Sequence, residues 1–248
     1  TAAVANTLIR NEGEFESATF GDADLKYLAK YPGSLGNSIE ISVCDTATAY
    51  SQSITNVDSD TTLTVAATTG SNSITITVAN DLDGFAQANT EAEAIVTALS
   101  VGDFIEVGNT TIGTQFMDIT AVGAVTRTGT TNTYTVSVTT KDDIRLREDV
   151  SMTAVKRYWG YFNLFDAAPA TSEYVSTRGS TGDEMHVAVI DKTGEITGTP
   201  NSVLETFPFL SRATDAKTED GSSAYVSTVL RETSNWVWYT NDRSNAAS

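Results

Sequence analysis

The 248-residue sequence has few of the residues that cross-link a chain or carry out chemistry. Its single cysteine, Cys44, excludes an internal disulfide and fits synthesis in a reducing cytoplasm. No apolar run approaches the roughly twenty residues that span a bilayer, and the first residues lack the basic and hydrophobic parts of a signal peptide. These scarcities favour a protein without a disulfide framework and without a membrane segment.

Basic residues are also scarce. Fifteen Lys and Arg stand against 32 Asp and Glu, so the net charge is −17. Close approach to a phosphate backbone or an anionic membrane is therefore repulsive, and neither nucleic acid nor membrane is an expected partner. The hydrophobic share of 40% is that of an ordinary folded protein with a substantial core.

Catalytic candidates are few. The only histidine, His186, and the only cysteine, Cys44, each fall inside an alternating strand pattern, which favours structural roles. No G-x-S-x-G elbow provides a nucleophile. We therefore predict no catalytic residue and no enzymatic activity.

Metal and nucleotide sites find equally little support. Three carboxylate pairs offer oxygens for a calcium ion, but none has the spacing of an EF-hand loop and all are expected to be solvated turn residues: Asp22 with Asp24, Asp81 with Asp83, and Asp142 with Asp143. One histidine and one cysteine argue against zinc, and Gly179–Gly182 lacks the lysine of a phosphate loop. No metal and no cofactor is expected.

Composition divides the chain. Residues 51–140 contain 22 threonines, nine acidic residues and one basic residue, Arg127. Strand patterns separated by Gly, Asn and Asp turns predict an all-β small barrel or sandwich, with strands at Thr62–Val65, Ser73–Val78, Phe104–Val107 and Thr133–Val138. Thr90–Leu99 predicts one short helix, with Thr90 and Glu93 as a capping box.

Basic residues return on both sides of this block. We therefore expect an α+β fold in which a mixed core domain, residues 1–50 and 141–248, is interrupted by a Thr-rich domain at 51–140. Before the block, Asp22 is expected to cap a helix with Leu25, Leu28 and Ala29 on its apolar stripe. Pro32 and Gly33 end it, and Ile39–Val43 alternates as a strand.

The last third predicts further elements of the mixed core. Met185–Ile190 is a strand, Asp191–Gly194 a hairpin turn, Glu195–Gly198 the start of the return strand, and Val203–Phe207 its continuation. Asp215–Gly221 is a polar loop. A helix follows from Ser222 or Ser223 as N-cap, with a stripe of Tyr225, Val226, Val229 and Leu230, and then a strand at Trp236–Tyr239.

Two of these segments resemble the tail sheath proteins of contractile-tailed bacteriophages. The first is the loop Lys30–Asn37 with the strand after it. The second has the order of motifs found in that family: Ile190–Thr199, Val203–Phe207, Ser211, Asp215–Lys217 and Asp220–Gly221, followed by a helix and an aromatic strand. The resemblance covers about a third of the chain and leaves 51–140 unmatched.

The resemblance implies a structural virion protein. Copies of the subunit would polymerise helically around a tail tube and contract to drive genome delivery, with tube and baseplate proteins as partners of the full-length protein. The protein would be made in the bacterial host cytoplasm and lie in the phage tail. Family members join neighbours through N-terminal and C-terminal arms, which we expect to be missing from this central fragment.

A carbohydrate-binding β-module, secreted or on a surface, is the alternative. The aromatic segments Tyr158–Phe162 and Trp236–Tyr239 motivate it, because sugars stack on aromatic rings. Strand-forming aromatics are more often core or subunit contacts. Loss of glycan binding on Trp159→Ala would support the alternative.

Overall fold

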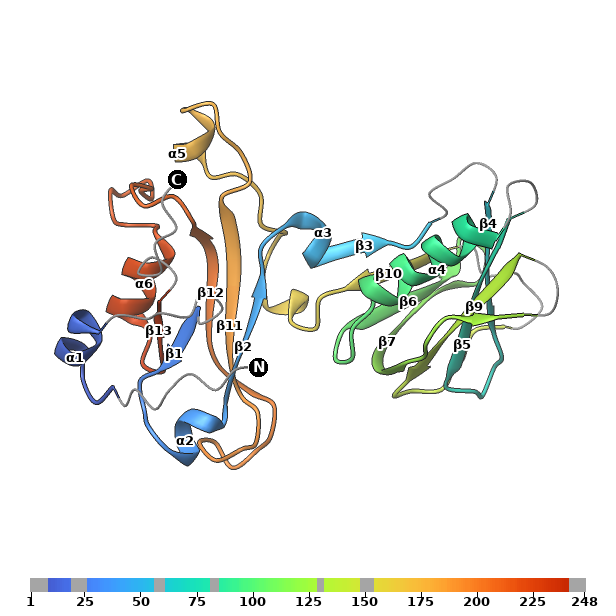
Figure 1. The fold of residues 1–248 in the computed structure, drawn as a ribbon, viewed down its shortest axis with the longest axis horizontal. Helices are drawn as coiled ribbons and strands as arrows, with labels where there is room; N and C mark the ends of the chain where they lie inside the picture. Colours follow the sequence, from blue (N-terminus) through green and yellow to red (C-terminus); the bar gives the residue numbers. More distant parts are fainter. Residues whose placement is uncertain are drawn as a thin grey trace. The chain divides into compact units, whose positions relative to one another are not determined.

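The computed structural model describes residues 9–18, 26–55, 61–80, 85–128, 132–147 and 154–240. The chain forms two compact units. Unit 1 comprises the described residues of 1–46 and 164–248, and unit 2 comprises those of 47–163. Helices and strands occur together, with strands predominating, so the fold is α+β (Figure 1).

Unit 1 is built on a three-stranded antiparallel sheet in the order β12-β11-β2. Its strands are β2 (Ile39–Cys44), β11 (Glu184–Asp191) and β12 (Ser202–Ser211). A second, two-stranded sheet pairs β1 (Tyr27–Ala29) with β13 (Val237–Tyr239). The helical segments are α1 (Glu12–Ser17), α2 (Ser34–Asn37), α5 (Glu173–Ser176) and α6 (Val226–Thr233), and η1 (Phe162–Leu164) lies at the boundary between the two units.

The central strand of unit 1, β11, is buried on both faces. All its residues from Met185 to Asp191 are buried. Met185, Val187 and Val189 share one core cluster with residues of β12, α6 and β13: Leu210, Val226, Leu230, Val237 and Tyr239. A central strand covered on both faces has no solvent side on which polar residues can alternate.

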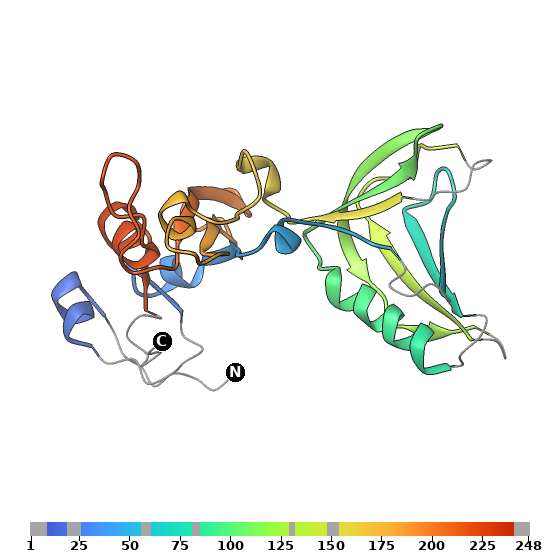
Figure 2. The same cartoon turned by 90° about the horizontal axis from the view of Figure 1, so that it is seen from above.

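Unit 2 contains one eight-stranded antiparallel sheet in the order β3-β10-β6-β7-β9-β5-β4, with β8 paired to β9. Its strands are β3 (Ser51–Ser53), β4 (Thr61–Ala67), β5 (Ser73–Asn80), β6 (Phe104–Asn109), β7 (Gly113–Val122), β8 (Thr126–Arg127), β9 (Thr133–Thr140) and β10 (Ala154–Tyr158). The sheet is curved, and α4 (Phe85–Ala98) lies against it (Figure 2). A short helix, α3 (Ala47–Tyr50), precedes β3.

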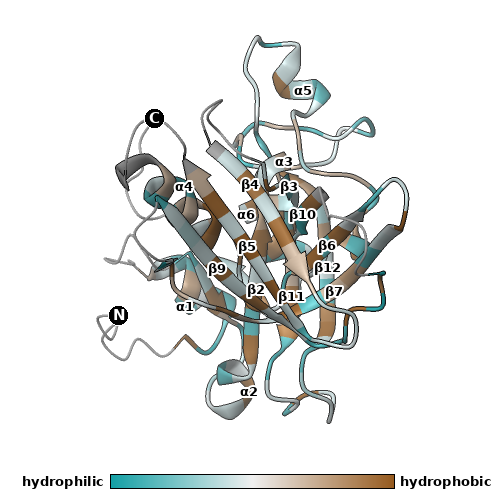
Figure 3. Ribbon diagram, turned by 90° about the vertical axis from the view of Figure 1, so that its right-hand side faces the viewer, coloured by the Kyte–Doolittle hydropathy of each residue, from teal (hydrophilic) through white to brown (hydrophobic). Residues whose placement is uncertain are grey.

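The four predicted strands of the Thr-rich block are confirmed within β4, β5, β6 and β9. Apolar and polar residues alternate along β4 and β5 (Figure 3), as expected for strands with one buried face. Ile74, Ile76 and Val78 of β5 are fully buried and pack with Ala88, Ala92 and Ile95 of α4. The long strand β7 pairs with both β6 and β9 and so joins the two halves of the sheet.

The helix predicted at Thr90–Leu99 is present in α4, which has fourteen residues and supplies part of the core, so an all-β architecture is not confirmed for this unit. The predicted capping box is wrong. The helix begins at Phe85, so Thr90 and Glu93 lie inside it. The apolar stripe that packs on the sheet starts upstream at Ala88, and tertiary packing thus lengthens the helix beyond its local start signal.

Three further predictions in unit 1 are wrong for tertiary reasons. Tyr27–Ala29 is a strand rather than a helix, because it pairs with β13; Asp22 and Leu25 lie outside the described residues. Helix α6 begins at Val226 instead of after Ser222 or Ser223, since bridges Lys217 to Ser223 and Ser211 to Tyr225 hold the preceding segment. The return strand starts at Ser202, and Glu195–Gly198 is part of a turn.

Candidate subunit-contact surface

The long turn between β11 and β12 is organised by one buried carboxylate. Asp191 accepts hydrogen bonds from the backbone N–H groups of Gly194 (3.0 Å), Ile196 (3.0 Å) and Thr197 (2.7 Å). The Thr197 hydroxyl (2.9 Å) and the Ser38 hydroxyl donate to it as well. The Asp191 side chain is therefore the centre around which the motif Ile190–Thr199 folds.

The same bonds set the charge state of Asp191. Burial alone would raise its pKa, but donors from Ser38, Thr197 and Ile196 outweigh burial and hold the pKa well below its usual range. Gly194 has φ +83°, and a Cβ there would lie 2.9 Å from the Pro200 nitrogen, so glycine is required.

Ser38 joins the two motif segments that are far apart in the sequence. Its hydroxyl contacts Asp191 and lies 2.6 Å from the Thr193 hydroxyl, and its carbonyl accepts from the Lys192 N–H (2.7 Å). The resemblance motifs at 31–37 and 190–199 thus meet in one place, which we call the motif corner (Ser34–Ser38 and Asp191–Asn201).

The loop before the motif corner is fixed to the C-terminal elements. The Lys30 ammonium donates to the carbonyls of Ser234 (2.5 Å) and Arg231 (3.2 Å) at the end of α6, where a cation is favourable. The Tyr31 ring lies 5.2 Å from the Trp236 ring. Gly36 passes so close to Tyr31 that a Cβ would lie 2.1 Å from its carbonyl oxygen.

This region exposes apolar side chains from a fixed backbone. Tyr31 is 44% exposed and Leu35 is 39% exposed. Within the described residues, β2, β1 and β13 each have one edge that pairs with no strand, and the outer edge of β12 is bridged only at Ser211, to Tyr225. Open strand edges and exposed apolar side chains on a rigid support are suited to contact with another chain.

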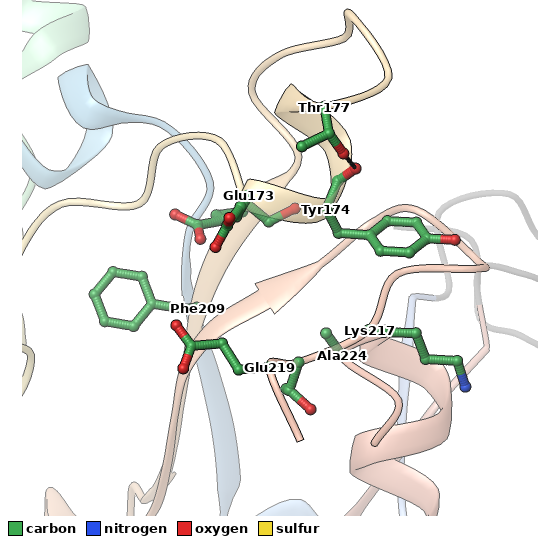
Figure 4. Close-up of a pocket in the computed structure, with 10 residues that line it drawn as sticks. Glu173, Tyr174, Thr177, Phe209, Lys217, Glu219 and Ala224 are labelled. Atoms are coloured by element: carbon green, nitrogen blue, oxygen red, sulfur yellow. Dashed lines mark hydrogen bonds between the residues drawn. The ribbon is translucent and has the colours of Figure 1, made fainter. Parts of the chain in front are cut away.

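Unit 1 also has a pocket of about 670 Å³ beside α5, lined by Ser172, Glu173, Tyr174, Thr177, Glu184, Phe209, Lys217, Thr218, Glu219 and Ala224. Figure 4 shows Glu173 and Glu219 on the same side as Phe209, with Lys217 and Tyr174 directed to the other side. The Thr177 hydroxyl donates to the Tyr174 carbonyl (2.9 Å), and the Thr218 hydroxyl donates to Asp220.

Asp183 supports one wall of this pocket. Its carboxylate accepts from the Ser172 N–H (2.9 Å), the Ser172 hydroxyl (2.8 Å) and the Ser211 hydroxyl. Burial would raise its pKa, but these donors lower it below the usual value. Asp183 thereby joins the start of α5 to the end of β12.

His186 is buried between two aromatic rings. Phe165 stacks on it at 4.4 Å and Phe209 meets it edge-on at 4.7 Å. Its Nε2 donates to the Ala167 carbonyl (2.8 Å), and its Nδ1 accepts from the Phe209 N–H (3.0 Å). The ring is therefore neutral and holds Phe209 in a left-handed conformation, φ +51°.

This arrangement predicts a pH-dependent stability. Burial lowers the pKa of His186, although the Ala167 carbonyl and Glu184 oppose the shift. The unfolded state therefore binds the proton more readily, and stability falls as pH drops below about 6.5. We expect the melting temperature of wild-type protein to fall between pH 7.5 and 5.5 by about 2–4 °C more than that of His186→Gln, by circular dichroism. Equal falls would contradict a titrating His186.

The remaining sequence candidates are dispersed. Cys44 is fully buried, with its Sγ 3.5 Å from the Thr46 carbonyl. Asp142 and Asp143 are exposed, whereas the pairs Asp22 with Asp24 and Asp81 with Asp83 lie outside the described residues. Across the part of the chain that the structure describes, no three His, Cys, Asp or Glu side chains form a metal-binding group. Gly179 and Gly182 have positive φ in the loop after α5.

The second aromatic segment lies mainly in a core, whereas the first is buried only at Trp159. Trp159 is only 5% exposed, which removes it as a stacking platform for sugars. Val237, Trp238 and Tyr239 are buried, and Trp238 stacks on Phe15 at 4.8 Å. The residues that matter most in unit 1, Asp183 and Asp191, were not singled out as site residues. Their signal is a carboxylate at each end of a buried strand.

Comparison with known proteins supports the resemblance seen in the two motifs. The chain is similar to the tail sheath protein of Salmonella phage ViI, with 25% identity over 93% of this chain and 33% of that protein. The chain thus spans about a third of the length of that relative. No protein-family profile and no solved structure matches the chain. This distant similarity suggests a sheath-like relationship and a structural role in a virion.

Proposed function

We propose that this chain is the central part of a contractile tail sheath subunit, which works through cohesion between copies and not through turnover. The observation that carries the proposal is the motif corner. Both segments that resemble sheath proteins converge there on Asp191 and Ser38, and the distant similarity to a phage tail sheath protein points the same way. Its exposed apolar side chains and the nearby open strand edges are where neighbouring copies would bind.

In this function, copies stack as a helical array around a tail tube, because a head-to-tail contact that does not close generates an open helix. Contraction is a shift between two packings of rigid subunits, and it drives genome delivery. Tube and baseplate proteins are further partners of the full-length protein, which is made in the host cytoplasm and carried in the virion. No described helix is long and apolar enough to cross a membrane.

The Thr-rich block would be a domain inserted into the mixed core. The strands through which the chain reaches and leaves unit 2, β3 and β10, are paired antiparallel, with Ser51 opposite Tyr158. An inserted domain needs its two ends close together, and the pairing of β3 with β10 brings them together. The unit would extend from Ala47 to Asn163, beyond the limits of the Thr-rich composition.

Electron microscopy of the purified full-length gene product tests the function. We expect hollow helical tubes, more abundant at high salt, because a net charge of −17 on this part alone makes copies repel each other when unscreened. Leu35→Asp should block tube formation, since it places a carboxylate in an apolar contact between copies. Val101→Asp, at an exposed apolar residue in unit 2, is the control.

Monodisperse monomers under all salt conditions would overturn the proposal. Tubes that form equally well with Leu35→Asp would remove the motif corner from the contact but leave the sheath function standing. Thermal unfolding of each variant separates loss of assembly from loss of folding.

A further inference from the structure

Phe116 is a large apolar side chain that unit 2 does not use in its core. It lies on β7, where its neighbour Met117 is buried, and it is 47% exposed itself. Alternation along the strand places Phe116 on the face opposite the core cluster. An exposed aromatic ring of this size on a rigid strand is a candidate contact surface.

A pocket of about 280 Å³ lies against this ring, lined by Thr114, Gln115, Phe116, Asp142, Arg145 and Leu146. Gln115 fixes the facing loop with both ends of its amide. Its Nε2 donates to the Asp143 carbonyl (2.9 Å), and its Oε1 accepts from the Arg145 N–H (2.8 Å). The Thr140 hydroxyl also donates to the Asp142 carbonyl (2.9 Å). The pocket is therefore formed before any ligand arrives.

Further aromatic rings continue the surface on the other side of Phe116. The Tyr158 ring lies 5.2 Å away at 43°, and the Phe162 ring lies 6.4 Å away and nearly parallel, at 12°. Tyr158 stands on β10, which pairs with β6, and β6 pairs with β7 (Figure 1). The Tyr158 hydroxyl donates to Glu106 (2.8 Å), so polar groups accompany the rings.

The polar side chains of the pocket are available to a ligand. Among the described residues, neither the Asp142 carboxylate nor the Arg145 guanidinium forms an ion pair or a side-chain hydrogen bond. Their opposite charges cancel within the pocket. It therefore offers one acceptor group, one forked donor group and one ring face, without a net charge that would select an ion.

This combination restricts the class of ligand. A nucleotide also stacks on aromatic rings, but its phosphate is repelled by a protein of net charge −17. A basic peptide is disfavoured because its positive charges would lie beside the Arg145 guanidinium. A neutral pyranose has an apolar C–H face for the Phe116 ring and hydroxyl groups that both donate and accept hydrogen bonds.

We propose that unit 2 binds a neutral saccharide in the pocket between Phe116 and the 142–146 loop, with Phe116 as the stacking platform and Asp142 and Arg145 as hydrogen-bonding groups. Trp159, the sequence-based candidate, does not take part, because it is buried. The argument for this site uses residues of unit 2 alone and does not depend on the sheath function.

The test is a glycan array probed with the complete chain. The array carries neutral oligosaccharides of glucose, galactose, mannose and N-acetylglucosamine beside sialylated and uronic-acid oligosaccharides. We expect binding to members of the neutral group. Isothermal titration calorimetry with the tightest-binding neutral oligosaccharide should show affinity at least about fivefold weaker for Phe116→Ala. Arg145→Ala, which removes no ring, should also weaken it.

Val101→Ala is the matched control, because Val101 is 66% exposed in the same unit and outside the pocket, and its affinity should equal that of wild type. Circular dichroism establishes that each variant is folded. The proposal is overturned if the folded wild-type chain binds no neutral glycan, if it binds only acidic glycans, or if neutral binding survives Phe116→Ala unchanged.

Discussion

Replacing Asp191 with alanine is expected to lower the melting temperature of unit 1 by about 10 °C or more. The substitution removes the acceptor of five donors: the buried Ser38 hydroxyl and, in part-buried bonds, the N–H groups of Gly194, Ile196 and Thr197 and the Thr197 hydroxyl. A buried donor without a partner retains its full desolvation penalty. Hydrogen exchange should show that residues 194–197 lose protection while β5 and β9 of unit 2 keep theirs.

Asp220→Ala is the control for this prediction. Asp220 is an exposed loop aspartate of the same unit that accepts from the Thr218 hydroxyl and from the Ser222 N–H (3.1 Å). Its removal should change the melting temperature by less than about 2 °C, because water replaces the lost acceptor. An Asp191→Ala protein as stable as Asp220→Ala would contradict the central role of Asp191.

Acid provides a second measurement on Asp191. Its pKa is lower in the folded than in the unfolded state, so the stability it contributes is present above about pH 3.9 and is lost as pH falls below that value. The acid-induced fall in stability should be shallower in Asp191→Ala than in wild type.

In unit 2, Asp103→Asn is expected to reduce the free energy of unfolding by about 3 kcal/mol. The Arg157 Nε lies 2.6 Å from the Asp103 carboxylate, and the two side chains are 12% and 8% exposed. Asp103 also accepts from the Gly160 N–H (3.0 Å), and Arg157 donates to the Ala49 carbonyl (2.5 Å). The change leaves a nearly buried guanidinium without a counter-charge.

The pair itself stabilises unit 2 less than its loss would suggest. Burial raises the pKa of Asp103, and the attraction of Arg157 offsets this only in part. The double variant Asp103→Asn with Arg157→Met should therefore be more stable than Asp103→Asn alone. Urea unfolding, monitored by hydrogen exchange in β5, β6 and β9, gives the free energy of unfolding of the single variant and of the double variant. A single variant within about 0.5 kcal/mol of wild type would contradict the prediction. Glu40→Gln is the control: it breaks the exposed ion pair with Lys192 and should change the free energy of unfolding by less than about 0.5 kcal/mol.

Local sequence patterns are sufficient to locate a strand where buried and exposed residues alternate along it. The alternation in Ser73–Val78 and Thr133–Val138 located β5 and β9, since the core on one side and solvent on the other impose a period of two. Local patterns are insufficient where contacts with distant segments determine the secondary structure. Tyr27–Ala29 is a strand only because β13 lies beside it, and residues 217–225 are held out of the helix by bridges to each other and to β12.

The candidate surfaces were predictable to different degrees. The motifs at 31–37 and 190–199 were recognised as sequence patterns, but their meeting through Ser38 and Asp191 is a tertiary contact with no local signal. Phe116 looks in the sequence like any strand aromatic. Only the burial of Met117 beside it and the loop at 142–146 distinguish it from a core residue.

The pairing of β3 with β10 has a consequence for the stability of unit 1. Because unit 2 starts and ends on neighbouring strands, it connects the two parts of the unit 1 sequence as a long loop with closely spaced ends would. The entropy of closing a loop grows only slowly with its length. Shortening or enlarging unit 2 is therefore expected to change the stability of unit 1 only slightly.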